Sequence, residues 1–224
     1  MTTAATRSAL LAGATGLIGS ALLPELCASH IPVHLLLRRA VPGIAATASG
    51  ARVQTHTVDF AALPTLPPLD DVFICLGTTI AQAGSKAAFR AVDFDAVLAV
   101  ARAAREAGAT RLAVVSSLGA DAGSGVFYNR VKGEMEAAVA ALGYEQLVIV
   151  RPSLLLGDRA VLGQPRRAGE QWMQRLLKPL GALVPASVRP IEAATVARAM
   201  LRVVRDGTPG LHSLPSSQLQ QLGR

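Results

Sequence analysis

The sequence predicts an α/β protein with a doubly wound parallel sheet. Short apolar runs, rich in β-branched residues, alternate along residues 8–157 with alanine-rich runs of helical character. Most of the apolar runs show no polar alternation, which is typical of strands buried on both faces. Buried strands joined by helices imply right-handed crossovers. Repeating this unit builds one open sheet with helices on both faces.

Six strands and three helices are expected in this part of the chain. The strands are expected at residues 8–14, 33–39, 52–60, 71–77, 111–119 and 145–157. The helices are expected at residues 16–29, at 85–108 and in a run that carries Tyr128. Gly108 suits the C-terminal stop of the long helix, because glycine readily adopts the left-handed conformation found there. The proline-rich residues 63–70 are expected to form a loop between strands.

Residues 157–224 are too few for an independent domain, so a single domain over residues 1–224 is expected. This last part is expected to be a small helical portion on the substrate side, with amphipathic helices at 169–181 and 192–207. The first of them places Trp172 on an apolar face. It is expected to pack over the sheet edge or to form a lid on the substrate cleft, with a homodimer contact as the alternative to a monomer. Binding to a membrane surface is the less favoured role.

Composition favours a large core and excludes several classes of protein. Half of the residues are hydrophobic (51%) and 17% are charged, which argues against disorder. Cys27 and Cys75 suggest no disulfide framework, and the four histidines show no ligand spacing, so no metal site is expected. The uncharged run from Ser8 to Pro24 is shorter than the ~20 residues that span a bilayer. A cytoplasmic location is therefore expected.

The net charge of +7 is unevenly distributed. Residues 1–150 carry eleven basic and eleven acidic side chains, whereas residues 151–224 carry eleven basic and four acidic. The excess reflects either arginine-rich usage or a surface for an anion such as a substrate phosphate or carboxylate. Stacking on single-stranded nucleic acid is disfavoured, since only Trp172 lies among these basic residues.

A glycine motif lies between the first strand and its helix. Gly13, Gly16 and Gly19 have the spacing G-x-x-G-x-x-G, with Thr15, Leu17 and Ile18 between them. Such a loop lets the backbone approach a pyrophosphate, and the following helix offers free N–H groups. We therefore expect dinucleotide binding. The alternative is a glycine-rich turn that only allows the helix and the sheet to pack closely.

Arg38 and Arg39 predict the type of dinucleotide. Arg38 stands nineteen residues after Gly19, where an NAD site would have a carboxylate for the ribose hydroxyl. Arginine instead grips a 2′-phosphate with forked hydrogen bonds, so NADP(H) is favoured over NAD(H). The alternative for both arginines is an ordinary exposed strand end.

Further cofactor contacts are expected where other strands end. Asp59 and Phe60 end the third strand and are placed to frame the adenine. The fourth strand ends in Leu76, Gly77, Thr78 and Thr79. Ligands of doubly wound sheets bind at this carboxyl edge.

Tyr128 and Lys132 are the candidate catalytic pair. Four residues make about one helical turn, so the two side chains project from the same face. A phenol titrates near ~10, and a nearby ammonium stabilises its phenolate, which can then exchange a proton with a substrate oxygen. The lysine can also hold the nicotinamide ribose. Ser116 or Ser117, at the end of the fifth strand, can hydrogen-bond the substrate oxygen, and Ser117 is our candidate catalytic residue. The alternative for the serines is strand-end capping.

The chain resembles the short-chain dehydrogenase/reductase superfamily over nearly its whole length. The segments GATGLIG, LLLRR, VDF, CLGTT, VVSS, YNRVK and VRPSLLLG carry this resemblance. The segments CLGTT and YNRVKGEMEAAV are more similar to the atypical branch that contains the Tat-interacting protein and its bacterial relatives. The resemblance implies an NADP-binding Rossmann fold, with Tyr128 as the proton donor or acceptor and Lys132 as its partner. It also implies that Pro152 and Ser153 lie against the nicotinamide.

Three departures from the epimerase-like members leave more than one function open. Leu118 stands where a catalytic serine or threonine is usual, Asp93 replaces an asparagine, and the C-terminal region is short. The first hypothesis is an NADP(H)-dependent oxidoreductase for a small carbonyl or alcohol, with Arg166 and Arg167 favouring an anionic substrate. The second is an NADP(H)-binding regulatory or sensor protein with little turnover. The third is a sugar-nucleotide epimerase or dehydratase.

Overall fold

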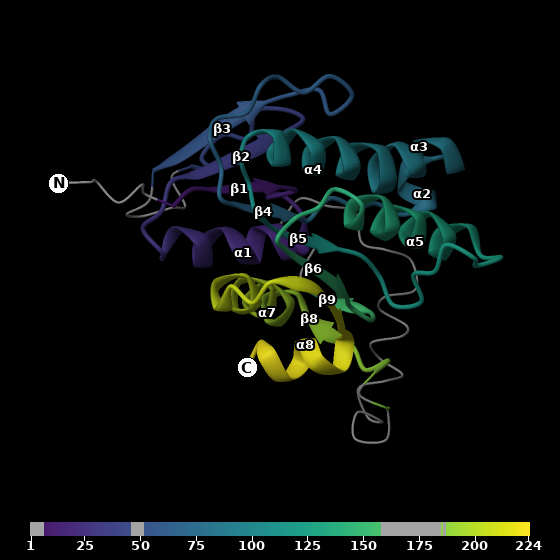
Figure 1. The fold of residues 1–224 in the computed structure, drawn as a ribbon. Helices are drawn as coiled ribbons and strands as arrows, with labels where there is room; N and C mark the ends of the chain where they lie inside the picture. The colour runs from purple at the N-terminus through teal and green to yellow at the C-terminus, as the bar shows by residue number, and fades with distance from the viewer. Residues whose placement is uncertain (1–6, 46–51, 158–184, 186) are drawn as a thin grey trace.

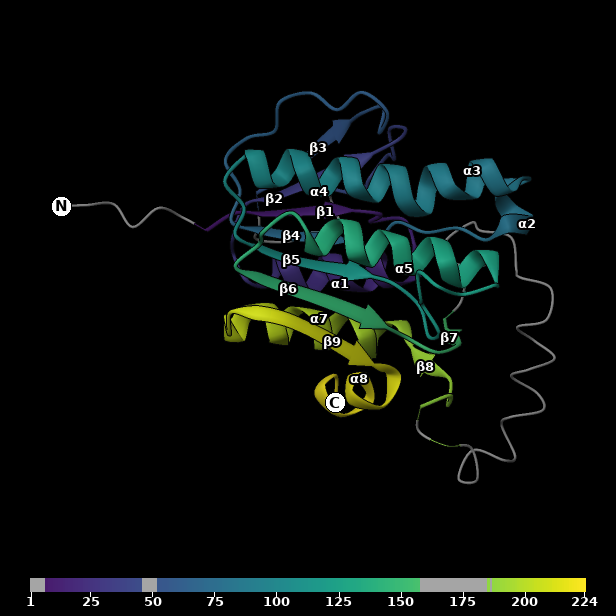
Figure 2. The ribbon, with the colours of Figure 1, turned by 45° about the vertical axis from the view of Figure 1, so that its right-hand side comes forward.

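The central feature of the fold is a seven-stranded parallel sheet, shown in Figures 1 and 2. The computed structural model describes residues 7–45, 52–157, 185 and 187–224. The strand order is β3-β2-β1-β4-β5-β6-β9, and all neighbouring strands are parallel. The strands are β1 (Ala9–Ala12), β2 (Val33–Leu37), β3 (Val53–Thr57), β4 (Asp71–Ile74), β5 (Arg111–Val115), β6 (Gln146–Arg151) and β9 (Gly210–Pro215). The order reverses direction at β1, so the predicted doubly wound Rossmann-like fold is confirmed.

Helices cover both faces of this sheet. α1 (Leu17–Cys27) and α7 (Ala193–Asp206) pack together on one face, and α4 (Val97–Glu106) and α5 (Phe127–Ala140) lie on the other (Figure 1). Each face has its own apolar core, and consecutive residues of a strand contribute to different cores. Leu11 belongs to the core under α1 and α7, and Leu10 to the core under α4 and α5. This is why the strand sequences are apolar without alternation.

The long helix expected at residues 85–108 is divided into three parts. α3 (Lys86–Arg90) leads into a π-helical segment, η1 (Ala91–Ala96), which continues into α4. A short helix, α2 (Ile80–Ala83), precedes them. A π-helical turn holds an extra residue and therefore rotates the side chains that follow it. Asp93, inside this segment, is fully buried.

The C-terminal part contributes more to the sheet than was predicted. β9 extends the sheet beyond β6, and α8 (Ser216–Leu222) follows it. A small second sheet joins β7 (Leu155–Leu156) to β8 (Ile191–Glu192). The region is therefore not only a helical substrate-side portion. α7 agrees with the helix expected at 192–207, whereas the one expected at 169–181, with Trp172, lies outside the described residues.

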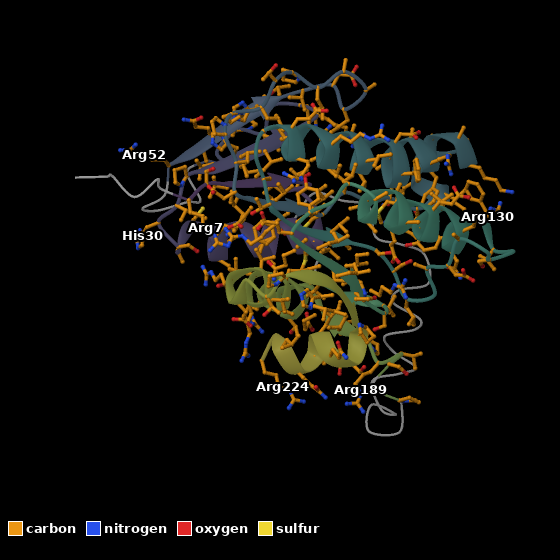
Figure 3. The ribbon with its side chains drawn as sticks, in the orientation of Figure 1. Arg7, His30, Arg52, Arg130, Arg189 and Arg224 are labelled. Atoms are coloured by element: carbon orange, nitrogen blue, oxygen red, sulfur yellow. The ribbon has the colours of Figure 1, made fainter. Side chains whose placement is uncertain are left out.

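Several arginines after residue 150 have structural partners. Arg151 is paired with Glu136, and Arg198 donates to the carbonyl of Gly223 at 2.7 Å. Arg202 donates to the carbonyl of Leu222 at 3.4 Å, so two arginines of α7 satisfy carbonyls at the end of α8. In Figure 3, Arg7, His30 and Arg52 lie on one side of the molecule and Arg130 on the opposite side, while Arg189 and Arg224 lie at the bottom near α8. Within the described part of the chain, no helix is both long and apolar enough to span a membrane.

A pH dependence of stability is expected from His34. This buried side chain of β2 lies 3.1 Å (Nδ1 to Nε2) from His56 of the exposed edge strand β3. Burial, and secondly the charge of His56, lower the pKa of His34 below its ordinary value. The unfolded chain then binds more protons than the folded chain below pH ~6.5. We therefore expect the free energy of unfolding to decrease as the pH falls through ~6.5 towards the lowered pKa.

Urea unfolding at pH 7.5 and 5.5 measures this decrease. His34→Gln should reduce it, whereas His212→Gln, at the opposite edge of the sheet, should leave it as in the wild type. Equal pH dependence in the wild type and His34→Gln would contradict the assignment.

Candidate functional site

The predicted site residues meet at the carboxyl edge of the sheet. Because all strands are parallel, the loops that follow them open at the same edge. The residues concerned follow β1, β2, β3, β4, β5 and β6, and they are Gly13–Gly19, Arg38–Arg39, Asp59–Phe60, Leu76–Thr79, Ser116–Ser117 and Pro152–Ser153. The first turn of α5 adds Tyr128, and its second turn adds Lys132.

Two of the three glycines in the loop are required by close packing, and the third is not. Gly13 has a φ of +90°, and a Cβ there would lie 2.5 Å from the carbonyl oxygen of Cys75. A Cβ at Gly19 would lie 2.7 Å from the carbonyl carbon of Gly13 and would overlap its oxygen. Close packing therefore requires both glycines. The nearest atom to a Cβ at Gly16, apart from its chain neighbours, would be the carbonyl oxygen of Gly13 at 3.4 Å, so packing alone does not require this glycine.

The N-terminus of α1 has no side-chain cap. Gly16 is its N-cap residue and offers no side-chain cap, while its own N–H donates to the carbonyl of Gly13 at 3.0 Å. The first N–H groups of a helix have no partner within the helix. Such N–H groups, together with the helix dipole, generally favour an anion at a helix N-terminus.

Arg38 and Arg39 follow β2 and are both exposed. Neither takes part in the ion pairs formed among the described residues. Asp59 instead accepts a hydrogen bond from the N–H of Ala61 at 2.9 Å, and Phe60 packs against the core under α4.

The loop after β4 is held by caps and by a carboxylate. Thr79 accepts from the N–H of Gln82 at 3.2 Å and caps α2. The N–H of Thr78 donates to Asp93 Oδ2 at 2.8 Å.

The thiol of Cys75, at the end of β4, is not a nucleophile. Desolvation raises the pKa of this thiol to about 12, so it stays protonated.

Two serine hydroxyls at the end of β5 lack partners. The N–H of Ser116 donates to the carbonyl of Val150 at 2.8 Å, but Ser116 Oγ and Ser117 Oγ are buried without a hydrogen bond in the described part of the molecule. A capping role would require such a bond. Buried polar groups in proteins nearly always have a hydrogen-bond partner, which these two hydroxyls lack among the described residues. Leu118, the next residue, is 42% exposed.

Tyr128 and Lys132 differ in their surroundings. The ring of Tyr128 packs 5.2 Å from that of Phe89, and its hydroxyl forms no hydrogen bond among the described residues. Lys132 is buried, with a side chain only 3% exposed. Its Nζ lies 2.7 Å from Asp93 Oδ1 and 3.5 Å from the carbonyl oxygen of Val115. The pairing with Asp93 was not predicted, and its only signal in the sequence is that Asp93 departs from the asparagine usual in the epimerase-like enzymes that the chain resembles.

Pro152 and Ser153 follow β6. The buried Pro152 accepts from the N–H of Leu118 at 3.0 Å, which joins the loops after β5 and β6. Ser153 Oγ contacts the carbonyl of Arg189 and lies 2.9 Å from Ser216 Oγ. The hydroxyl of Ser153 is thus bonded to the C-terminal part of the chain.

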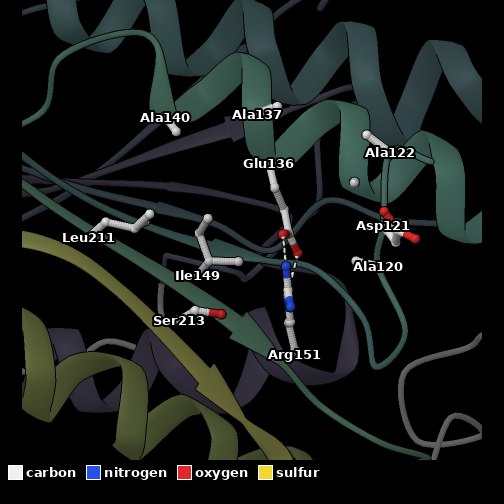
Figure 4. Close-up of a pocket in the computed structure, with 11 residues that line it drawn as sticks. Ala120, Asp121, Ala122, Glu136, Ala137, Ala140, Ile149, Arg151, Leu211 and Ser213 are labelled. Atoms are coloured by element: carbon white, nitrogen blue, oxygen red, sulfur yellow. Dashed lines mark hydrogen bonds and ion pairs between the residues drawn. The ribbon is translucent and has the colours of Figure 1, made fainter. Parts of the chain in front are cut away.

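A cavity of about 320 Å³ lies beside α5, next to β6 and β9 (Figure 4). The Glu136–Arg151 ion pair lies at its centre, with Arg151 Nε 3.0 Å from Glu136 Oε1. The hydrogen bonds that Arg151 donates to Glu136 raise the pKa of Arg151 above its ordinary value. None of the predicted site residues lines this cavity. Its arginine, Arg151, is already paired with the carboxylate of Glu136. It is therefore separate from the candidate site.

The comparison with known families assigns the chain. A family model described as NAD(P)H-binding matches residues 13–206. The chain belongs to this NAD(P)H-binding family. The match begins at the first glycine of the loop and ends with α7, so the family covers the whole candidate site. Among the described residues, no group of three or more histidine, cysteine, aspartate or glutamate side chains is placed to hold a metal ion.

Curated relatives support the same assignment. This NAD(P)H-binding protein is 35% identical over 227 aligned residues to Protein HTATIP2 of Rattus norvegicus. The alignment covers 97% of this chain and 90% of that protein. It is 40% identical over 156 aligned residues to the protein of Emericella nidulans named "Protein fmp52, mitochondrial". That alignment covers 66% of this chain and 67% of the relative. The predicted resemblance to the branch that contains the Tat-interacting protein is thereby confirmed, at the level of the NAD(P)H-binding family and its HTATIP2 and FMP52 relatives.

Solved structures share the fold. MoeE5 in complex with UDP-glucuronic acid and NAD has a TM-score of 0.71 and 19% identity, covering 92% of this chain and 75% of that one. UDP-glucose 4-epimerase from Thermotoga maritima has a TM-score of 0.67 and 16% identity, covering 96% of this chain and 81% of that one.

The predicted cytoplasmic location is wrong, because the names of several relatives point to another compartment. Several of the fungal relatives, including those of Emericella nidulans and Eremothecium gossypii, are named mitochondrial proteins. Cysteine content carried the prediction, and it reports only a reducing environment, which does not identify one compartment.

Proposed function

We propose that this protein is an NADP(H)-dependent oxidoreductase that acts on a small carbonyl or alcohol. One observation carries the proposal. Tyr128, whose hydroxyl has no hydrogen-bond partner in the described structure, stands one turn before the buried Lys132, at the sheet edge where Ser116 and Ser117 also lack partners. These hydroxyls suit a ligand oxygen at the place where a proton would be exchanged.

The residues present fit a dinucleotide with a 2′-phosphate. The uncapped N-terminus of α1 would hold the pyrophosphate, and Arg38 and Arg39 would hold the 2′-phosphate. Residues 76–79 and Pro152 would flank the nicotinamide half, at the carboxyl ends of β4 and β6. When bound, the cofactor supplies or accepts a hydride.

The chain's own residues would manage the proton. In the direction of reduction, Tyr128 gives its hydroxyl proton to the carbonyl oxygen as the alcohol forms. The Lys132 ammonium stabilises the phenolate that remains, and solvent returns the proton. Ser117, with Ser116 beside it, donates a hydrogen bond to the same oxygen and orients the carbonyl. In oxidation each proton moves in the opposite direction.

Replacement of both arginines tests the cofactor preference. We expect Arg38→Ala combined with Arg39→Ala to weaken NADPH binding by about 10- to 100-fold, because charge-assisted hydrogen bonds to the 2′-phosphate are lost. NADH binding should stay within about twofold, since NADH lacks that phosphate. Calorimetric titration of both cofactors measures these constants. Arg52→Ala, at another exposed arginine, is the control. Equal losses for NADPH and NADH, or none for either, would contradict the preference.

An exposed leucine favours a second candidate function. Leu118 occupies the position where the epimerase-like enzymes usually have a catalytic hydroxyl, and a regulatory protein that binds NADP(H) would need no hydroxyl there. Turnover separates the two candidates. A sensor would bind NADPH tightly but would not oxidise it in a Tyr128-dependent way with any member of a broad carbonyl panel.

The charge of the substrate belongs to the same panel. Arg166 and Arg167, the residues proposed to favour an anion, lie outside the described residues. The panel should therefore include matched acidic and neutral carbonyls. A KM advantage for acidic substrates that disappears when both arginines are neutralised would support an anionic substrate.

A further inference from the structure

A fully buried carboxylate lies behind the proposed catalytic lysine. Asp93 is 0% exposed, and its two oxygens have different partners. Oδ1 lies 2.7 Å from Lys132 Nζ, and Oδ2 accepts the N–H of Thr78 at 2.8 Å. We infer that Asp93 is a positioning residue that fixes Lys132 and ties it to the loop after β4. This inference rests on the proposed function, because it assigns the tie to the cofactor side of that site.

The π-helical segment brings Asp93 to this place. Asp93 and Asp95 both lie in η1, yet Asp93 is buried whereas Asp95 is exposed. Segments of this kind are frequent at functional sites, where the extra residue directs a side chain inward. The side chain of Asp93 thus leaves the helical layer and reaches the end of β4. The same turn supplies a matched control residue for experiment.

The lysine depends on this carboxylate for its counter-charge. Among the described residues, Asp93 is the one carboxylate within 4.0 Å of Lys132 Nζ. The other carboxylates of α5 have partners of their own, since Glu134 pairs with Arg90 and Glu136 pairs with Arg151. Without Asp93 the Lys132 ammonium would be buried without a counter-charge, a condition that disfavours the charged form.

The pair lies directly beneath the loop that faces the cofactor. A Cβ at Gly77 would be 3.4 Å from Asp93 Oδ1 and 3.9 Å from Lys132 Nζ. Gly77 itself is exposed and carries no side chain between the pair and a ligand. A change in the Asp93–Lys132 pair is therefore expected to alter this loop, which Asp93 also holds through the Thr78 N–H. Buried ion pairs are weak evidence for stability, so a role in the site better accounts for the arrangement.

A double-mutant cycle on the Kd of NADPH tests the inference. The variants are Asp93→Asn, Lys132→Met and both together, with Asp95→Asn as the control and thermal unfolding as the check of folding. If Asp93 acts through Lys132, each single change should weaken NADPH binding by roughly tenfold, and the double variant should bind no more weakly than either single variant. Asp95→Asn should bind as the wild type does.

Other results would overturn the inference. Asp93→Asn that unfolds at a lower temperature but binds NADPH with the wild-type Kd would show a purely structural carboxylate. Losses that multiply in the double variant would show that Asp93 acts independently of Lys132.

Nuclear magnetic resonance of the wild type keeps the inference testable if a single variant does not fold. The chain has only three lysines, so the ¹⁵Nζ signal of Lys132 can be assigned. In the cofactor-free protein this ammonium and the Thr78 amide should both exchange slowly with solvent, and rapid exchange of the ammonium would overturn the tie. On addition of NADPH both signals should shift, while that of the exposed Lys86 should not. Slow exchange with no response to NADPH would support the tie but contradict the proposed function.

Discussion

Tyr128→Phe is expected to lower kcat for carbonyl reduction by about 10²- to 10⁴-fold, the usual contribution of a positioned acid or base. The substitution removes only the hydroxyl, because phenylalanine retains the ring that packs 5.2 Å from that of Phe89. The Kd of NADPH should stay within about twofold of the wild type, so the loss would lie in the proton transfer. Steady-state rates with the best substrate of the carbonyl panel, together with calorimetric titration of NADPH, measure both quantities.

The second tyrosine of the chain is a matched control. The hydroxyl of Tyr144 donates to the carbonyl of Ala101 at 2.6 Å, and burial raises its pKa above the usual range. Tyr144→Phe removes a buried hydrogen bond and should lower stability by about 1 kcal/mol. It should leave kcat unchanged. Turnover that survives Tyr128→Phe would exclude this residue as the proton donor and would favour the regulatory candidate.

Gly19→Ala is expected to destabilise the fold by about 3 kcal/mol, the upper part of the usual range for overpacking. The new methyl group would overlap the backbone of Gly13, and a backbone atom cannot turn aside as a flexible side chain can. The loop and the start of α1 would have to separate. Urea unfolding measures the change, and NADPH binding should be lost with the shape of the loop.

Gly16→Ala separates packing from binding in the same loop. A Cβ at Gly16 would lie 3.4 Å from the carbonyl oxygen of Gly13, so the loss of stability should stay below about 1 kcal/mol. The methyl group would nevertheless stand at the N-terminus of α1, where the pyrophosphate is proposed to bind. We therefore expect weaker NADPH binding in a folded protein. Wild-type stability of Gly19→Ala, or unchanged binding by Gly16→Ala, would contradict this division of roles.

Local sequence determined most of the fold. Residues of β1 such as Leu10 and Leu11 enter opposite cores, so a buried strand must be apolar throughout and can be recognised from a few residues. The glycine loop was also predictable, because the turn, the close packing and the helix start lie within seven residues of each other. The four-residue spacing of Tyr128 and Lys132 predicted their common face for the same local reason.

Other features were decided by contacts between distant segments. β9 has little apolar character, and it forms a strand because the edge of β6 offers backbone partners. The π-helical segment depends on the core that buries Asp93, which the helix-forming residues around it do not specify.

The difference between what local sequence predicts and what tertiary contacts decide is clearest at Lys132. Its spacing from Tyr128 was local information, but its counter-charge comes from Asp93, thirty-nine residues earlier in the chain. A buried charge can be accounted for only when its surroundings are known, because its energy depends on every partner brought to it by the fold. The sequence by itself therefore determined the sheet, the glycine loop and the candidate pair. Only the tertiary structure decided which charges meet at that pair and which hydroxyls are left for a ligand.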